Sequence, residues 1–307
     1  MRRTWTIFPA LALCVALAGG PADAAQRKFH SPQEAVDALV KAVRVNDRTA
    51  LMAILGAEGR DIVASGDENE DAARRNKFVA AYDEHSKLDQ INPYKTMLDV
   101  GNDNWQFPIP LVKSKAGWRF DTAAGRNELL ARRIGQNEMA AIQASLAYVD
   151  AQKEYASEDR GDGVLDYAQR FRSTPGKHDG LYWETAGNEP ESPLGPGFAK
   201  ARAEGYFGNA DPNSGPQPFH GYYFKILTGQ GADAKGGAYN YMVGNRMIGG
   251  YAMVAYPASY RVSGVTTFIV NQDGVVYQQD LGPKTSEIAS RMTVFNPGPG
   301  WTKAPQN

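Results

Sequence analysis

The chain has 307 residues, of which 33 are basic and 34 acidic, so its formal net charge is −1. This balance, without a basic stripe, excludes the electrostatic footprint of a nucleic-acid-binding protein. The length suits two domains of ordinary size, each able to bury its own core.

The first 24 residues have the pattern of a secretory signal peptide. Arg2-Arg3 precedes an apolar stretch over residues 5–18, and Ala22-Asp23-Ala24 supplies the small residues of a cleavage site. The only cysteine, Cys14, lies within the apolar stretch, and a lipoprotein signal acylated there is the alternative. Cleavage after Ala24 predicts a periplasmic or extracellular protein, and its lack of cysteine excludes thiol catalysis, thiolate metal sites and disulfides.

The mature chain is not expected to carry a transmembrane anchor. After residue 24, no apolar segment approaches the ~20 residues that a membrane-spanning helix needs.

Residues 25–121 are predicted to form a small α+β domain. The first helix begins after the capping box of Ser31 and Glu34, and Asp47 caps a second helix. A third, highly charged helix is predicted over residues 68–87, and strands over residues 94–100, 105–112 and 117–120. Pro108 and Pro110 place the second of these strands at a sheet edge.

The order of these elements, opening with SPQEAVDALVKAVRVNDRTAL, resembles small nuclear-transport-factor-like domains over residues 28–121. The resemblance implies a curved sheet that wraps a helix and often encloses an apolar pocket. An unrelated α+β domain is the alternative.

Residues 122–307 are predicted to form a second domain, in which a long helix packs on an antiparallel sheet. The helix runs from Asp121 to Tyr155, and its apolar side includes Leu146. We expect Leu146 to be buried, so that Leu146→Ala lowers stability by ~2–5 kcal/mol. Residues 157–220 show little periodicity and are predicted to be irregular loops. Strand patterns follow over residues 221–228, 249–255, 265–271 and 275–281, with a tight turn between the last two.

Four stretches of the chain are similar to a family of uncharacterised secreted bacterial proteins, domain of unknown function 2950 (DUF2950). They are HGYYFKILTGQG, GGYAMVAYPASY, SGVTTFIVNQDGVVYQQDLGP and EDRGDGVLDYA. The resemblance extends over most of the mature chain and implies no established activity, cofactor or catalytic residue.

The C-terminal domain also resembles the globular half of type IV pilins and pseudopilins. The likeness rests on a long helix, an irregular connection and a meander that contains TTFIVNQDGVVY. Pilins polymerise through an apolar N-terminal helix, whereas Gln26-Arg27-Lys28 is polar here. We therefore do not expect the chain to assemble into a pilus.

An acidic segment follows the long helix and suggests a calcium site at Asp159, Asp162 and Asp166, since hard cations prefer several oxygen ligands on a flexible turn. The spacing departs from a helix–loop–helix site: counted from Glu158, the third position is Arg160 and the twelfth is Gln169. A solvated acidic turn is therefore favoured, and calcium is the alternative. No other cofactor is expected, because the four histidines lack the spacing of a metal site.

Ligand-binding candidates are Trp183 and Glu184 in an aromatic loop, with His220 and Tyr222 at the start of the first strand of the meander. Aromatic rings beside a carboxylate suit a sugar or a peptide, because the rings stack on apolar faces and the carboxylate orients the ligand. The alternative is that these rings pack onto the sheet and that His220 is bonded to backbone.

The sequence contains no nucleophile elbow and no phosphate-binding glycine loop, and no catalytic residue is predicted. We therefore favour an exported, non-catalytic envelope protein that binds or scaffolds an unidentified ligand or protein. One alternative is a hydrolase of envelope polymers that uses loop carboxylates or His220, since paired acid–base groups leave no local motif. Another is a soluble accessory of pilus or secretion machinery, by analogy of fold.

Overall fold

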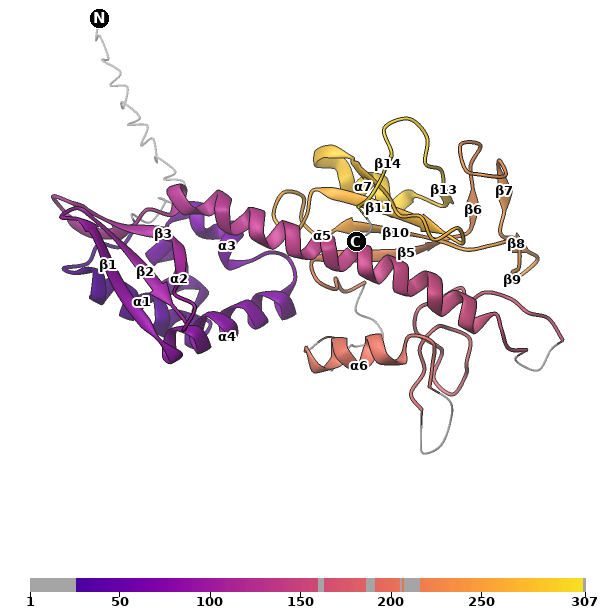
Figure 1. Ribbon diagram of the computed structural model, residues 1–307, viewed down its shortest axis with the longest axis horizontal. Coiled ribbons are helices and arrows are strands. Elements are labelled where there is room, and N and C mark those ends of the chain that lie inside the picture. Colours follow the sequence, from indigo (N-terminus) through magenta and orange to yellow (C-terminus); the bar gives the residue numbers. More distant parts are fainter. Residues whose placement is uncertain (1–25, 160–162, 186–190, 205, 207–215, 306–307) are drawn as a thin grey trace, which may run out of the picture.

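The computed structural model describes residues 26–159, 163–185, 191–204, 206 and 216–305, and shows two α+β bodies joined by one long helix (Figure 1). The predicted signal peptide, residues 1–24, lies outside the described residues. Among those residues, no helix combines the length and the apolar character that a membrane span requires.

The N-terminal body, residues 26–121, packs helices against one face of an antiparallel sheet. Its helices are α1 (Pro32–Arg44), α2 (Arg48–Leu55), the short 3-10 turn η1 (Ala57–Gly59), α3 (Arg60–Val63) and α4 (Glu68–Glu84). Its strands are β1 (Ser86–Asn92), β2 (Lys95–Val100), β3 (Trp105–Ser114) and β4 (Gly117–Phe120), in the order β1-β2-β3-β4. The predicted cap at Ser31 is confirmed, because Glu34 N–H donates to Ser31 Oγ at 3.1 Å. The other half of the capping box is shifted by one residue, since Glu34 Oε2 accepts from His30 N–H at 2.9 Å and not from Ser31.

The prediction that the proline-containing strand lies at a sheet edge is wrong. β3 lies between β2 and β4. Its register with β2 shifts between the pairs Thr96–Leu111 and Leu98–Phe107, so Pro108 and Pro110 fall within an irregular stretch of the ladder. A bulge tolerates proline inside a sheet because no ladder bond is required from the missing N–H groups. The strand β1 was not predicted, since its first residues continue the charged pattern of α4.

The long helix α5 (Thr122–Tyr155) is continuous, as predicted, and spans about 50 Å at 1.5 Å per residue. Its first half packs on β3 of the N-terminal body, and its second half crosses the sheet of the C-terminal body (Figure 1). Leu146 is half-buried and packs against the core of the C-terminal body, so the predicted burial is only partial. The face turned to the sheet is instead centred on Tyr148, Val149 and Gln152, so Leu146→Ala should cost less than was expected.

The contact between α5 and β3 depends on a glycine. A Cβ at Gly125 would lie 2.4 Å from the Pro108 carbonyl oxygen, a backbone atom that cannot move aside, whereas a Cβ at Gly135 would meet nothing within 4 Å. We expect Gly125→Ala to lower the free energy of unfolding by about 1–3 kcal/mol through overpacking. Gly135→Ala, the matched control on the same helix, should raise it by up to about 1 kcal/mol. Denaturant unfolding of both variants measures this, and equal effects would mean that α5 does not approach β3 so closely.

The C-terminal body is built on an antiparallel sheet of order β14-β12-β11-β10-β5. Its strands are β5 (Tyr222–Leu227), β10 (Ala252–Pro257), β11 (Thr266–Asn271), β12 (Tyr277–Asp280) and β14 (Thr302–Lys303). Two small sheets are formed by β6 (Gly229–Gln230), β7 (Tyr239–Asn240) and β13 (Val294–Phe295), and by β8 (Met242–Val243) and β9 (Arg246–Met247). The turn η2 (Gly282–Lys284) leads into α7 (Thr285–Arg291), which packs on β10, and α6 (Gly195–Ala203) lies on the other side of α5 (Figure 1). The four predicted strands of the meander are confirmed as β5, β10, β11 and β12. β10 is buried along its whole length, because α5 and α7 both pack on it.

Candidate functional site

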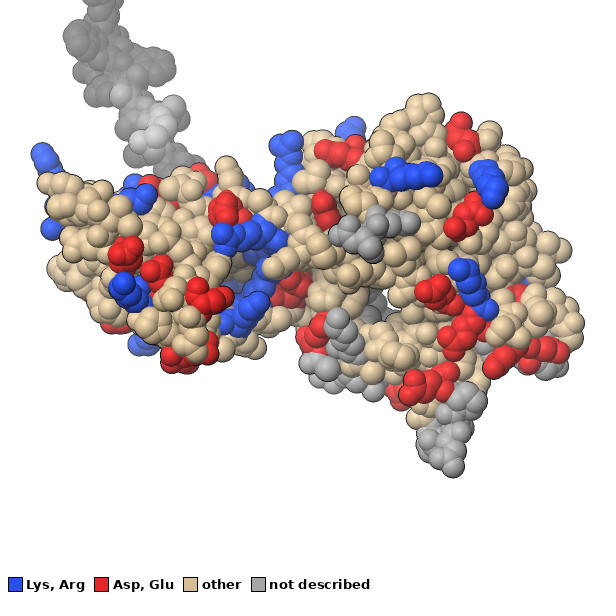
Figure 2. Space-filling model, in the orientation of Figure 1, with Lys and Arg blue, Asp and Glu red and all other residues tan. Residues whose placement is uncertain are grey.

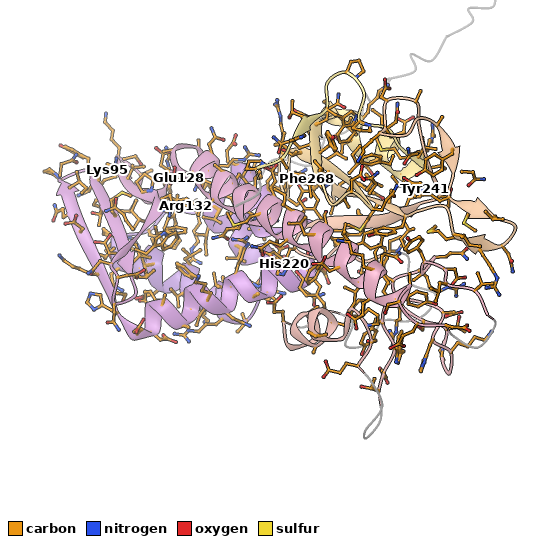
Figure 3. All side chains as sticks on the ribbon, turned by 45° about the vertical axis from the view of Figure 1, so that its right-hand side comes forward. Lys95, Glu128, Arg132, His220, Tyr241 and Phe268 are labelled. Carbon is orange, nitrogen blue, oxygen red and sulfur yellow. The ribbon has the colours of Figure 1, made fainter. Side chains whose placement is uncertain are left out.

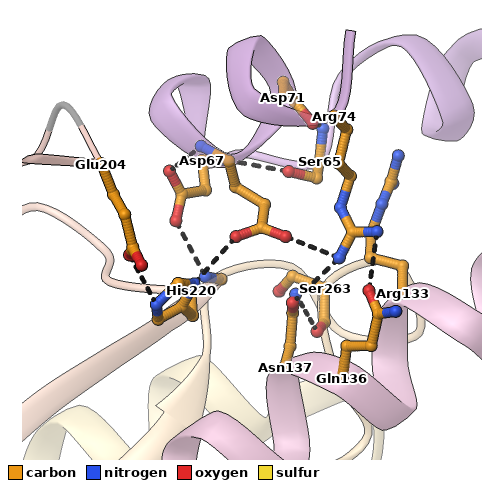
Figure 4. A network of polar contacts seen from close by, with 12 residues as sticks. Ser65, Asp67, Asp71, Arg74, Arg133, Gln136, Asn137, Glu204, His220 and Ser263 are labelled. Atoms are coloured by element: carbon orange, nitrogen blue, oxygen red, sulfur yellow. Dashed lines mark hydrogen bonds and ion pairs between the residues drawn. The ribbon is translucent and has the colours of Figure 1, made fainter. Parts of the chain in front are cut away.

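Charged and polar side chains from both bodies and from α5 meet where the two bodies touch (Figure 4). Figure 3 places His220 at this junction, beside α5. We call the following seven residues the interdomain cluster: Asp67, Glu70, Arg74, Asn137, Glu204, Tyr206 and His220. In the space-filling view, the outline narrows to a notch between the bodies, and basic side chains border it on the N-terminal body (Figure 2).

Asp67 connects the start of α4 to the C-terminal body. One carboxylate oxygen caps the helix by accepting a hydrogen bond from Glu70 N–H at 3.0 Å. The other accepts from Gly221 N–H at 2.8 Å and from the Tyr206 hydroxyl at 3.0 Å. Burial raises the pKa of Asp67, and the three hydrogen bonds only partly offset that effect. The Asp67 side chain therefore has two roles: it caps α4, as an N-cap residue does, and it also bonds the N-terminal body to the C-terminal body.

Glu70, in the first turn of α4, lies between two cations. Its Oε2 is 3.1 Å from His220 Nδ1, and its Oε1 is 2.5 Å from an Arg74 guanidinium nitrogen. Burial alone would raise the pKa of Glu70, but the bond from His220 and the charge of Arg74 outweigh it and hold the pKa below its ordinary value. Glu70 is therefore an ionised, buried carboxylate at neutral pH.

Both ring nitrogens of His220 face carboxylates. Nε2 lies 3.1 Å from Glu204 Oε2, on the side opposite Glu70. Only the imidazolium form has N–H groups on both nitrogens, so this geometry favours the protonated ring. Burial lowers the pKa of His220, but the hydrogen bond from its ring to Glu70 and the charges of Glu70 and Glu204 raise it above its ordinary value.

A left-handed turn points His220 toward the N-terminal body. His220 has φ +47° and Gly221 has φ +72°, so two consecutive residues adopt the left-handed region just before β5. A Cβ at Gly221 would lie 2.4 Å from Asn137 Nδ2 and 2.9 Å from Ser263 Cβ. Glycine at this position thus supplies both the backbone conformation and the close approach of α5.

The middle of α5 supplies the third side of the cluster. Asn137 is buried, donates to the Ser263 carbonyl oxygen at 3.0 Å, and accepts from Arg74 at 3.4 Å. One turn earlier, Arg133 donates to the carbonyl oxygens of Asp61 and Ile62 at 2.5 and 2.8 Å. Polar groups of α5 therefore bind one body through Arg133 and both bodies through Asn137.

The cluster can serve as a charged joint between the bodies. Its two cations, Arg74 and His220, both contact Glu70, which lies between them, and His220 also faces Glu204. The cluster is not sealed from solvent, because the side chains of His220 and Glu204 are 25% and 33% exposed. A small polar ligand can therefore reach its rim.

Stability should depend on pH through this joint. The raised pKa of His220 means that its contribution is complete below the ordinary value of 6.5 and is lost as pH rises through the folded-state pKa. The lowered pKa of Glu70 means that its contribution is complete above 4.5 and is lost as pH falls through the folded-state value. We expect the stability difference between wild type and His220→Gln to be largest between pH 4.5 and pH 6.5, where both contributions are complete, and to shrink toward pH 9. Denaturant unfolding at several pH values measures it, and a difference independent of pH would contradict the ion pair.

The predicted ligand-binding residues do not form one site. Trp183 is half-buried and stacks on the exposed His178 ring, with centroids 4.3 Å apart, and Glu184 is exposed and 3.7 Å from Arg172. They belong to the loops that follow α5, whereas His220 lies at the junction of the bodies (Figures 1 and 3). Tyr222 is fully buried and donates to the Thr266 carbonyl oxygen at 2.9 Å, so it is a core residue without a surface for a ligand.

The acidic turn is described only in part. Asp159 accepts hydrogen bonds from Gly163 N–H at 3.0 and 3.1 Å, and Asp166 lies 4.0 Å from an Arg246 nitrogen. Asp162 lies outside the described residues. Within the described part of the chain, no three His, Cys, Asp or Glu side chains are grouped as metal ligands. Calcium binding at this turn stays a prediction.

Sequence reasoning identified only His220 among the seven cluster residues. Asp67 and Glu70 have the three-residue spacing of a capping box, which marks the start of α4 but not its partners. Glu70 and His220 are 150 positions apart, and no local pattern distinguishes Glu70 from the exposed charges of the same helix.

The fold and the cluster define a protein of two α+β bodies that share one helix and are joined by the half-buried ion pair of Glu70 and His220 and by the hydrogen bonds of Asp67. The family model of proteins of unknown function DUF2950 matches residues 26–304, and the chain belongs to this family. No curated protein and no solved structure matches the chain. The resemblances to nuclear-transport-factor-like domains and to pilins are therefore not confirmed.

Proposed function

We propose that the protein is exported to the periplasm or the cell surface, where it binds or scaffolds another envelope component and turns over no substrate. Export is supported by the signal-peptide pattern of residues 1–24. It is also supported by the family match, which begins at residue 26, just after the expected cleavage point.

The observation that carries the non-catalytic proposal is the occupied ring of His220. A general base needs a free lone pair within reach of a substrate proton. Here Glu70 and Glu204 each lie 3.1 Å from one ring nitrogen. The strongest constellation of titratable groups in the described residues thus serves to hold two bodies at a fixed spacing, which is what a scaffold requires.

The ligand surface that we propose is the aromatic loop around Trp183. The preceding residue, Tyr182, is buried, and its ring stacks on the half-buried Phe198 ring, with centroids 4.2 Å apart and planes within 4°. Next to these rings, Arg172 and Glu184 place opposite charges at the surface. Stacked rings beside fixed charges suit an envelope glycan or an extended peptide, because the rings cover apolar faces and the charges orient polar groups.

Binding experiments with envelope glycans and peptides test this proposal. With a ligand that binds wild type, we expect Trp183→Ala to weaken binding about tenfold or more, as truncation of a central aromatic contact does. His220→Gln, remote from the loop, should leave the affinity within about twofold, since it removes no contact to the ligand. Equal losses in both variants would contradict the assignment to the loop.

A hydrolase remains the second candidate, and one observation favours it. Asp67 and Glu70 are bridged by the Tyr206 hydroxyl, at 3.0 and 3.4 Å, and their pKa values are displaced in opposite directions. Two neighbouring carboxylates whose pKa values are displaced in opposite directions are typical of acid–base pairs. Turnover of an envelope polymer that disappears in Asp67→Asn and persists in Trp183→Ala would establish this reading and overturn the first. A role as an accessory of pilus or secretion machinery would need the pilin likeness, which no solved structure supports.

A further inference from the structure

The sheet of the N-terminal body has one covered edge and one open edge. At β4, Phe29 and Trp118 exchange backbone hydrogen bonds of 2.9 and 2.8 Å, which closes that edge. At the other end of the sheet, β1 pairs with β2 on one side only, and its residues are exposed or half-buried along the whole strand (Figure 1). Among the described residues, none bonds to the outer side of β1.

The backbone groups that face the open edge follow from the ladder. Gly101 N–H donates to the His85 carbonyl oxygen at 2.9 Å, which makes these two residues a hydrogen-bonded pair. Hydrogen-bonded and non-bonded pairs alternate along an antiparallel ladder, so Lys87–Asp99 and Asp89–Met97 are bonded pairs as well. The N–H and C=O groups of Ser86, Leu88 and Gln90 therefore point outward.

The side chains of β1 make this edge complementary to itself. If a second β1 pairs antiparallel about a two-fold axis at Leu88, Lys87 faces the second copy's Asp89 and Asp89 faces the second copy's Lys87. An axis one residue earlier would place Lys87 opposite itself, and an axis one residue later would do the same with Asp89. Opposite charges across a strand pair stabilise it, and like charges destabilise it. Charged side chains on an exposed edge strand commonly prevent it from pairing with other chains. On β1, Lys87 and Asp89 instead favour a single register of pairing.

We propose that two copies of the chain associate through β1, antiparallel about Leu88, and so join their sheets edge to edge. In this register the outward groups of Ser86 meet those of Gln90, and the groups of Leu88 meet those of Leu88 in the other copy. Ile91, which is 52% exposed, comes opposite His85 and loses part of its contact with water. The partner that fits this edge is a second copy, because the strand itself supplies both charges at the spacing that the pairing requires.

Charge reversal and mixing test the proposal in solution. We expect sedimentation velocity to show wild type as a dimer, and Lys87→Asp and Asp89→Lys each as a monomer at the same concentration. Each single change converts two attractive pairs into two repulsive pairs, so the dissociation constant should rise about tenfold or more. An equal mixture of the two variants restores opposite charges across the edge and should dimerise, as should the doubly exchanged variant. Lys95→Asp, a charge reversal at an exposed position of β2, is the matched control and should remain dimeric.

Three results would overturn the proposal. They are a monomeric wild type at millimolar concentration, a dimer that survives both single charge reversals, and single variants that stay monomeric when mixed. Circular dichroism of each variant checks that it is folded. The mixture is the decisive sample, because a dimer formed from two substituted chains shows that charge, and not misfolding, keeps each variant monomeric alone.

Discussion

Replacement of Tyr148 by alanine is expected to lower the free energy of unfolding by about 3–5 kcal/mol, as truncation of a fully buried aromatic side chain does. Tyr148 is 1% exposed and lies where α5 crosses the sheet of the C-terminal body. Its ring meets Phe171 and Tyr251 edge-on, each with centroids 5.8 Å apart. Removal of the ring opens a cavity that these neighbours cannot fill without moving α5.

Two further variants separate the contributions at this position. Tyr148→Phe removes only the hydroxyl, which donates to the Ala252 carbonyl oxygen at 3.2 Å and accepts from Gln152 at 3.1 Å, so a loss of about 1–2 kcal/mol is expected. Met139→Ala, on the same helix but 58% exposed, should change stability by less than about 0.5 kcal/mol. Denaturant unfolding measures all three. Similar values for Tyr148→Ala and Met139→Ala would mean that α5 does not complete this core.

Glu70→Ala is expected to lower the free energy of unfolding by about 2–4 kcal/mol near pH 6. Loss of one partner leaves the other charges of a buried ion pair uncompensated, which typically costs about 3–5 kcal/mol. We expect somewhat less, because the side chains of His220 and Arg74 are about a quarter to a third exposed and regain some hydration. The variant should also uncouple the two bodies, so that calorimetry shows two unfolding transitions in place of one.

A neighbouring carboxylate provides the control for this experiment. Glu68 is on the same helix and 3.0 Å from Arg48, but its side chain is 81% exposed. Exposed ion pairs contribute little, so Glu68→Ala should stay within about 0.5 kcal/mol of wild type. A loss in Glu70→Ala no greater than this would show that the interdomain cluster does not hold the bodies together.

Local signals in the sequence predicted most of the secondary structure. The caps at Ser31 and Asp47, the uninterrupted helical pattern after Asp121 and the β-branched runs of the meander each depend on neighbouring residues, and each matches an observed element. The internal position of β3 was not predicted, because strand order depends on pairing between distant residues, and β1 was not predicted, because its first residues continue the charged pattern of α4. The burial of Leu146 was overestimated, because an apolar pattern identifies the buried face of a helix but not which of its residues lie in the middle of that face.

The functional candidates were harder to predict for the same reason. His220 was recognised from its position before a strand, but its partners are carboxylates on α4 and near the end of α6, far away in the chain. Charged side chains are normally exposed, so a sequence pattern gives no reason to bury Glu70. Trp183 was predicted in an aromatic loop and lies in one, half-buried against His178, whereas Tyr222, predicted beside His220 at the start of a strand, is buried in the core.

Because both bodies are attached to the same rigid helix, the length of α5 sets their mutual orientation. Gly125 determines which side of the helix faces β3, and Asn137 determines which side faces Ser263 in the C-terminal body. One residue inserted between them would rotate the second body by about 100° and displace it by about 1.5 Å. Seven inserted residues would nearly restore the angle but would separate the bodies by about 10 Å, beyond the reach of Glu70 and His220. Evolution can therefore exchange side chains along this segment, but it cannot readily lengthen or shorten it.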